Sequence, residues 1–120
     1  MDIKLGKNSE GMYLLELAGN LDLISSDQLK DYVMKMIKTR IESFIISLKN
    51  IESINSAGIG ALIFISSTLR KLNSTVIMLI PEGPVLEALE VSRLRNYFTI
   101  VHTLKDALEI TSTASGKKTA

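Results

Sequence analysis

The pattern of apolar and polar residues along this chain changes its period several times, and each change marks an expected element. Short apolar runs or strict alternation predict five strands, at Ile3–Leu5, Tyr13–Ala18, Phe44–Leu48, Val76–Ile80 and Phe98–Val101. Spacing of three and four residues predicts about four helices, near residues 26–38, 57–72, 84–92 and 104–110. A turn signal at residues 8–11 joins the first two strands as a hairpin. The order β-β-α-β-α-β-α-β-α predicts an α/β domain with a mainly parallel five-stranded sheet and an antiparallel N-terminal edge strand.

Polar residues mark where the first two helices begin. Ser25 is followed three residues later by Gln28, which is the pattern of a capping box, so Ser25 is expected to be the N-cap of the first helix. Asn55 and Ser56 are both favourable N-cap residues for the second helix.

The helix over 57–72 has more apolar residues than one buried face requires. Its core stripe follows steps of three and four residues and consists of Gly58, Leu62, Ile65, Leu69 and Leu72. Ile59, Ile63 and Phe64 fall outside this stripe. Either neighbouring helices bury them, which is the commoner fate of such residues, or they form an exposed apolar patch that docks a partner beside Ser56.

Gly58 and Gly60 lie in the first turn and a half of the same helix. In a helix interior each glycine costs about 1 kcal/mol relative to alanine. Small residues at these positions indicate that something packs close to the helix backbone. Two candidates are open, the sheet beneath the helix and a partner outside it.

Composition narrows the class of protein. The 120 residues suffice for one domain, expected over 1–112 with a polar tail over 113–120. The formal net charge of +1 gives no reason to expect nucleic acid or an anionic membrane surface as a partner. The chain has no cysteine, which excludes disulfides and thiolate chemistry. No apolar run approaches the roughly 20 residues of a membrane span, and the N-terminus has no signal-peptide core, so the chain is expected to be soluble and cytoplasmic.

Ser56 is the strongest candidate for chemistry. It either caps the helix and does nothing else, or carries an anion such as its own phosphate at the positive end of the helix. Asp22, Ser56 and His102 could be written as a hydrolase triad, but no Gly-x-Ser-x-Gly turn surrounds Ser56. The glycines that follow are not succeeded by the Lys-Ser/Thr pair of a phosphate loop. A binding module without metal or cofactor is therefore expected, rather than an enzyme.

The segment Leu48–Leu62 resembles the signature of the STAS family, the anti-sigma-factor antagonists. That signature is a strand followed by an apolar residue, Asp or Asn, Ser, a small residue, Gly, an apolar residue and Gly. Gly19–Asp22 matches a second family feature, Gly-x-Leu-Asp, and the resemblance spans about Ile3–Ile110. The chain departs from the commonest family pattern at Asn55, where most members have Asp, and at Ala57, where many have Ser or Thr.

The resemblance implies an anti-sigma-factor antagonist that binds an anti-sigma factor with serine-kinase activity. Phosphorylation of Ser56 by that kinase would release the partner, and a phosphatase would reset the switch. The residues expected to touch the partner are Asp22, Asn55, Ser56, Gly58, Ile59 and Ile63. Asp22 is either a local loop residue or a neighbour of Ser56, because both follow the carboxyl ends of parallel strands.

Two alternative functions stay open. One is a STAS accessory subunit of a lipid or anion transporter, which would not need modification of Ser56. The other is a nucleotide-binding sensor module.

The placement of the helices is open as well. The strands at 44–48 and 76–80 are apolar throughout, which indicates helices on both faces of the sheet, whereas the resemblance implies helices largely on one face.

Overall fold

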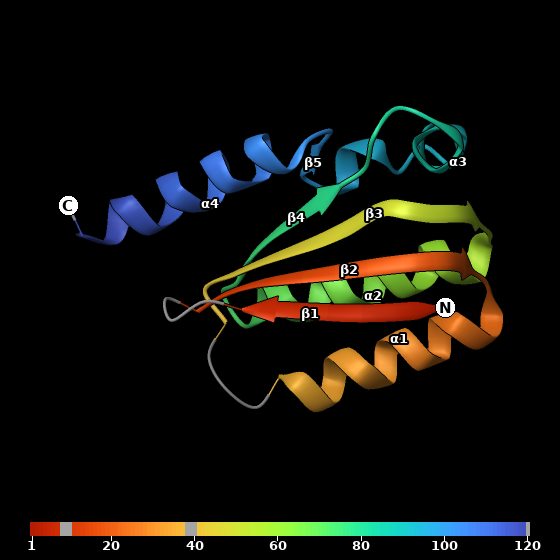
Figure 1. Cartoon of the computed structure of the whole chain (residues 1–120), viewed down its shortest axis with the longest axis horizontal. Coiled ribbons are helices and arrows are strands. Elements are labelled where there is room, and N and C mark those ends of the chain that lie inside the picture. Colours follow the sequence, from red (N-terminus) through yellow and green to blue (C-terminus); the bar gives the residue numbers. More distant parts are fainter. Residues whose placement is uncertain (8–10, 38–40, 120) are drawn as a thin grey trace.

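The computed structural model describes residues 1–7, 11–37 and 41–119, with side chains as far as Thr111. The hairpin turn predicted at 8–11 lies largely outside these ranges. The elements within them, shown in Figure 1, are β1 (Asp2–Lys7), β2 (Met12–Leu21), α1 (Leu23–Met36), β3 (Ser43–Ile54), α2 (Ser56–Lys71), β4 (Thr75–Leu79), α3 (Pro84–Val91), the 3-10 helix η1 (Arg95–Tyr97), β5 (Ile100–Val101) and α4 (Leu104–Thr119).

The strands lie side by side in chain order, β1-β2-β3-β4-β5. β1 is antiparallel to β2, with Ile3 opposite Leu17, and each later pair of neighbouring strands is parallel. The predicted fold class is therefore confirmed, including the antiparallel N-terminal edge strand. α4 continues to Thr119, through most of the segment that the sequence predicts as a polar tail.

Alternate residues of the central strands enter two separate apolar clusters. Phe44 and Ile46 of β3 belong to the larger cluster, together with side chains of α1, α2 and α3. Ile45 belongs to a smaller cluster with Ile77 of β4 and Ala107 of α4. Both faces of the sheet are therefore covered, as the apolar strands indicate, and α1, α2 and α3 share one face. In Figure 1, α2 is seen behind the strands, so the view is from the side of the smaller cluster.

Two predictions about helix ends are wrong. α1 begins at Leu23 with Asp22 as its N-cap, and Ser25, the predicted N-cap, lies in its first turn. Both Asp22 and Ser25 are good caps, and the reciprocal hydrogen bonds between them favour the earlier start. Leu72 is not in the core but 51% exposed, because α2 ends there and Asn73 turns the chain with a φ of 65°.

Candidate functional site

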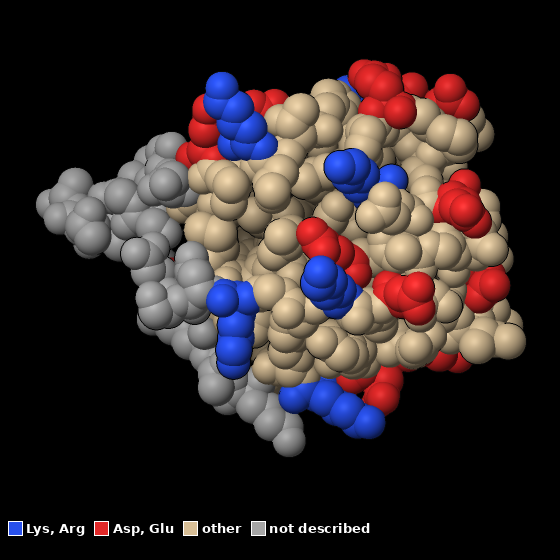
Figure 2. Space-filling model, viewed as in Figure 1, with Lys and Arg blue, Asp and Glu red and all other residues tan. Residues whose placement is uncertain are grey.

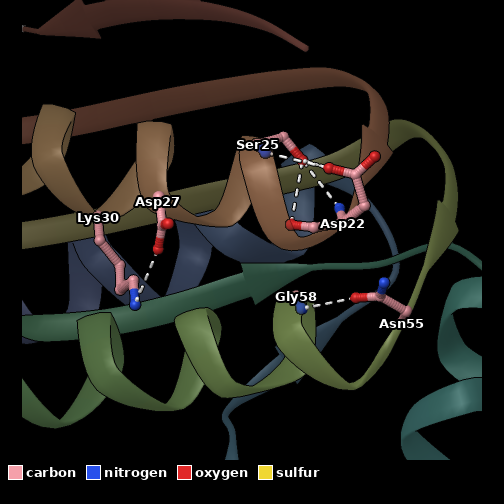
Figure 3. Close-up of polar contacts among 6 residues, drawn as sticks. All are labelled: Asp22, Ser25, Asp27, Lys30, Asn55 and Gly58. Atoms are coloured by element: carbon pink, nitrogen blue, oxygen red, sulfur yellow. Dashed lines mark hydrogen bonds and ion pairs between the residues drawn. The ribbon is translucent and has the colours of Figure 1, made fainter.

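The candidate site lies where β2 and β3 end and where α1 and α2 begin. β3 runs on to Ile54, past the predicted apolar run, and pairs with β2 as far as Leu21. The backbone N–H of Asn55 then donates to the carbonyl oxygen of Leu21 over 3.2 Å. The starts of the two helices are therefore held side by side, with Asp22 and Asn55 as their N-caps (Figure 3).

Asp22 is engaged in local hydrogen bonds. Its Oδ1 accepts the N–H of Ser25 over 3.1 Å, and its own N–H donates to Ser25 Oγ over 2.8 Å. The Ser25 hydroxyl donates in turn to the carbonyl oxygen of Asn20, 2.7 Å away. The N–H of Ser25, above all, stabilises the ionised carboxylate and lowers the pKa of Asp22 from its ordinary value. Asp22 thus has a local capping role, which is one of the two roles expected from the sequence. Its position is also next to the start of α2.

Asn55, not Ser56, caps α2. The Oδ1 of Asn55 accepts the N–H of Gly58 over 3.1 Å, and Ser56 is the first residue of the helix. Ser56 is exposed, and its Oγ makes no hydrogen bond with any residue that the structure describes. The backbone N–H groups of Ser56 and Ala57 are among those that a helix start leaves without internal acceptors. The Ser56 hydroxyl is therefore accessible and lies at the positive end of a 16-residue helix.

The two glycines of α2 have different surroundings. A Cβ at Gly58 would lie 2.5 Å from the carbonyl oxygen of Leu21 and 2.8 Å from Cγ1 of Ile54, whereas a Cβ at Gly60 would meet nothing within 4 Å. The sheet beneath the helix therefore explains Gly58. Gly58 is buried against the end of β2, and its expected contact with a partner stays a prediction. Gly60 is exposed, and nothing inside the described molecule requires a small residue there.

Ile59 does not belong to an exposed patch. It is only 8% exposed and is part of the larger core cluster, so it has a packing role, and its predicted contact with a partner stays a prediction. The reason is that α2 packs on the sheet and against α1 at the same time, which covers two flanks of its first turns. Ile63 is half-buried and packs against the same cluster, and Phe64 is 45% exposed.

Three exposed residues of α2 follow one another at intervals of four, which places them along one side of the helix. They are Ser56, Gly60 and Phe64. The ammonium group of Lys30 on α1 lies 5.9 Å from the centre of the Phe64 ring, so this side of α2 adjoins α1. Ser56 is therefore the first residue of an exposed row along α2 that ends at the aromatic ring of Phe64.

Two large apolar side chains extend this surface beyond α2. Leu23 and Ile24, in the first turn of α1, are 65% and 81% exposed and follow Asp22 directly. The sequence pattern does not single them out, because Ser25 as the predicted N-cap places both residues before the helix. Asp22 as N-cap with Ser25 three residues later is the signal that would have found them. We call the exposed set the helix-start surface; it consists of Asp22, Leu23, Ile24, Asn55, Ser56, Gly60 and Phe64.

The other serines near Ser56 are less available for modification. Ser53 donates its hydroxyl to Oδ1 of Asn20 over 2.8 Å, across the ends of β2 and β3. Ser66 is fully buried inside α2, and Ser67 is half-buried. Ser56 thus combines an exposed position at a helix end with a free hydroxyl among the described residues.

No hydrolase triad is assembled in the described part of the chain. The Nδ1 of His102 lies 2.8 Å from the carbonyl oxygen of Ile80, and this ring is engaged on the α4 side of the sheet. The carboxylate of Asp22 is bound to Ser25 instead.

Within the described residues no group of three His, Cys, Asp or Glu side chains could hold a metal ion. None of the described helices has the length and apolar character needed to cross a membrane.

A family model of the STAS domain matches residues 6–107, which is most of the chain. The chain therefore belongs to the STAS domain family. A comparison with curated protein sequences gives no match.

Several solved structures share the fold. The anti-sigma factor antagonist SpoIIAA in its unphosphorylated form is 17% identical over 93% of this chain and 97% of that chain, with a TM-score of 0.76. An anti-sigma factor antagonist from Mycobacterium paratuberculosis is 19% identical over 92% and 93% of the two chains, with a TM-score of 0.78. A sulfate transporter family protein from Wolinella succinogenes is 18% identical over 87% of each chain, with a TM-score of 0.71. At these identities the likeness concerns the fold, and the STAS-like α/β fold expected from the sequence is confirmed.

Proposed function

We propose that this protein is an anti-sigma-factor antagonist that binds an anti-sigma factor with serine-kinase activity and is released when that kinase phosphorylates Ser56. One observation carries the proposal. Asn55 takes over the capping of α2, which leaves the exposed Ser56 hydroxyl without a structural hydrogen bond among the described residues. The protein acts as a partner and substrate of the kinase, not as an enzyme, and a phosphatase resets it.

The position of Ser56 makes a phosphate compatible with the fold. Phosphorylation adds a charge of about −1.5 to −2 at neutral pH. At the first residue of α2 this charge meets backbone N–H groups and the positive end of the helix dipole, so the helix start tolerates it. SpoIIAA, which shares the fold, has been solved in both an unphosphorylated and a phosphorylated form. The proposed switch therefore works at the surface rather than by unfolding.

The helix-start surface supplies the contact that a phosphate would disrupt. Leu23, Ile24 and Phe64 offer exposed apolar area, and the open space at Gly60 lets a partner approach the helix backbone. Burying a phosphate against such a surface carries a large desolvation cost. The charge on Ser56 therefore weakens the complex while the domain stays folded.

The first test is the position of the phosphate. After incubation with ATP and a kinase-type anti-sigma factor from the same cell, mass spectrometry should find one phosphate, on Ser56. Ser56→Ala should carry none and should keep the partner bound. A phosphate on Ser53, or none on the natural protein, would contradict the proposal.

Asn55→Asp is the matched variant for the departure from the family pattern. Aspartate keeps the oxygen that accepts the N–H of Gly58, so α2 should start at the same residue. If a carboxylate helps to present Ser56 to the kinase, this variant is phosphorylated faster than the natural protein. An unchanged rate would show that the amide of Asn55 serves equally well.

The second candidate function is a STAS subunit of an anion transporter. The fold likeness to a sulfate transporter family protein favours it over the remaining alternatives. In that role Ser56 stays unmodified, and purification from the native cell yields a membrane complex instead of an anti-sigma factor. The identity of the co-purified partner separates the two functions.

A further inference from the structure

A cavity of about 380 Å³ lies on the α4 side of the sheet and shares no residue with the helix-start surface. Its volume is in the range of small-molecule sites, which begins at roughly 300 Å³. We propose that this cavity binds a small organic acid, with its carboxylate on Lys49 and its alkyl chain on the leucines of the floor. The proposal is independent of the proposed function, because neither site uses the residues of the other.

The register of three neighbouring strands builds the floor of the cavity. Glu16 of β2 pairs with Ser47 of β3, which pairs with Leu79 of β4. Lys49 follows Ser47 by two residues, and both line the cavity, in keeping with the alternation of side chains along a strand. The sheet therefore presents an acid, a hydroxyl, an amine and an apolar side chain to one space.

Ser47 supplies the observation that points to an anion. Its side chain lines the cavity, and the residue is only 8% exposed. Its Oγ accepts the N–H of Lys49 over a long 3.4 Å, and its hydroxyl proton has no acceptor among the described residues. A ligand oxygen placed in the cavity can accept this proton. A carboxylate provides such an oxygen and is attracted to the Lys49 ammonium group as well.

The opposite wall comes from the start of α4. Thr103 caps this helix by accepting the N–H of Asp106 over 3.2 Å, and both Thr103 and Leu104 line the cavity. The first turn of a helix carries partial positive charge, which adds to the attraction for a carboxylate. Figure 2 shows this side of the molecule, where acidic and basic side chains are interspersed over a largely uncharged surface.

The remaining lining sets the shape of the acid. Leu14, Leu79 and Leu104 offer apolar contact to an alkyl chain. Glu16 is the acidic group in the lining, and it would repel a second carboxylate on the ligand. The cavity should therefore prefer a monocarboxylate over a dicarboxylate of similar length.

The test is an NMR titration of the full chain with three probes, sodium valerate, sodium glutarate and pentylamine. Valerate should give saturable shifts at the amides of Ser47, Lys49 and Leu104, whereas pentylamine and glutarate should each bind at least fivefold more weakly. Equal shifts with valerate and pentylamine, or shifts that never saturate, would overturn the proposal.

Three substitutions sharpen the result. Lys49→Met should weaken valerate binding roughly 10-fold or more, the usual worth of a charge-assisted hydrogen bond. Lys71→Met, which removes an exposed lysine of α2 outside the cavity, should leave it unchanged, and equal behaviour of the two variants would refute the site. Glu16→Gln should bring glutarate close to valerate, and an unchanged preference would refute the role of Glu16. Thermal unfolding of each variant confirms that it is folded.

Discussion

A methyl group at Gly58 would lie 2.5 Å from the carbonyl oxygen of Leu21, closer than such atoms approach without a shift of the backbone. The same carbonyl accepts the N–H of Asn55. The end of β2 and the first turn of α2 are therefore in direct backbone contact. This contact brings Ser56 close to Asp22 although the two residues are far apart in the sequence.

The first prediction compares the two glycines of α2. Gly58→Ala should destabilise the protein by about 1–3 kcal/mol, because α2 must move away from β2 to make room. Gly60→Ala is the matched control and should stabilise it by about 0.5–1 kcal/mol, since alanine favours the helix and the space is open. Urea unfolding measures both. Equal effects of the two substitutions would contradict the close contact.

The second prediction separates packing from binding. Ile59→Asp should lower the free energy of unfolding by more than about 3 kcal/mol, because it buries a carboxylate in the core. Phe64→Asp should leave the protein folded and weaken binding of the anti-sigma factor, because this ring is largely exposed. Thermal unfolding and partner pull-down test the pair. A folded Ile59→Asp variant that loses its partner would return Ile59 to the contact surface.

The third prediction concerns acid pH. The pKa of Asp22 is lowered in the folded protein, chiefly by the N–H of Ser25, while in the unfolded chain it stays near 3.9. The unfolded chain therefore binds the extra proton first as pH falls. The stability that Asp22 contributes is complete above about pH 3.9 and is lost as pH falls through the lowered pKa. Asp22→Asn should show a smaller loss of stability over this acid range. An identical pH profile for both proteins would contradict the carboxylate's role.

The fourth prediction uses the end of α3. Arg93 has a φ of 59°, a conformation that costs a residue with a side chain about 1 kcal/mol or more. Its N–H donates to the carbonyl oxygen of Glu90, as in a helix end that usually carries glycine. Arg93→Gly should therefore raise the melting temperature by a few degrees. Ser92→Gly, one residue earlier at a φ of −79°, should lower it.

Local signals in the sequence predict the strands and the start of α2 well, because an apolar run or an N-cap acts within a few residues. They do not distinguish two caps three residues apart, so the pattern predicts Ser25 as the N-cap of α1 although Asp22 has that role. Burial of Ile59 depends on how α1 packs against α2, which no pattern within α2 contains. Likewise, the sequence alone does not show which of Gly58 and Gly60 lacks room for a side chain. That difference depends on the position of Leu21 against Gly58.

The most direct measurement is the affinity of one anti-sigma factor for three forms of this protein. Calorimetry should give similar affinities for the natural protein and Ser56→Ala. The form phosphorylated on Ser56 should bind roughly 100-fold more weakly, which corresponds to about 2.7 kcal/mol. Its thermal unfolding should stay cooperative and close to that of the natural protein, because the phosphate lies at a helix start. Undiminished binding by the phosphorylated form, or release that accompanies unfolding, would contradict a switch that acts at the surface.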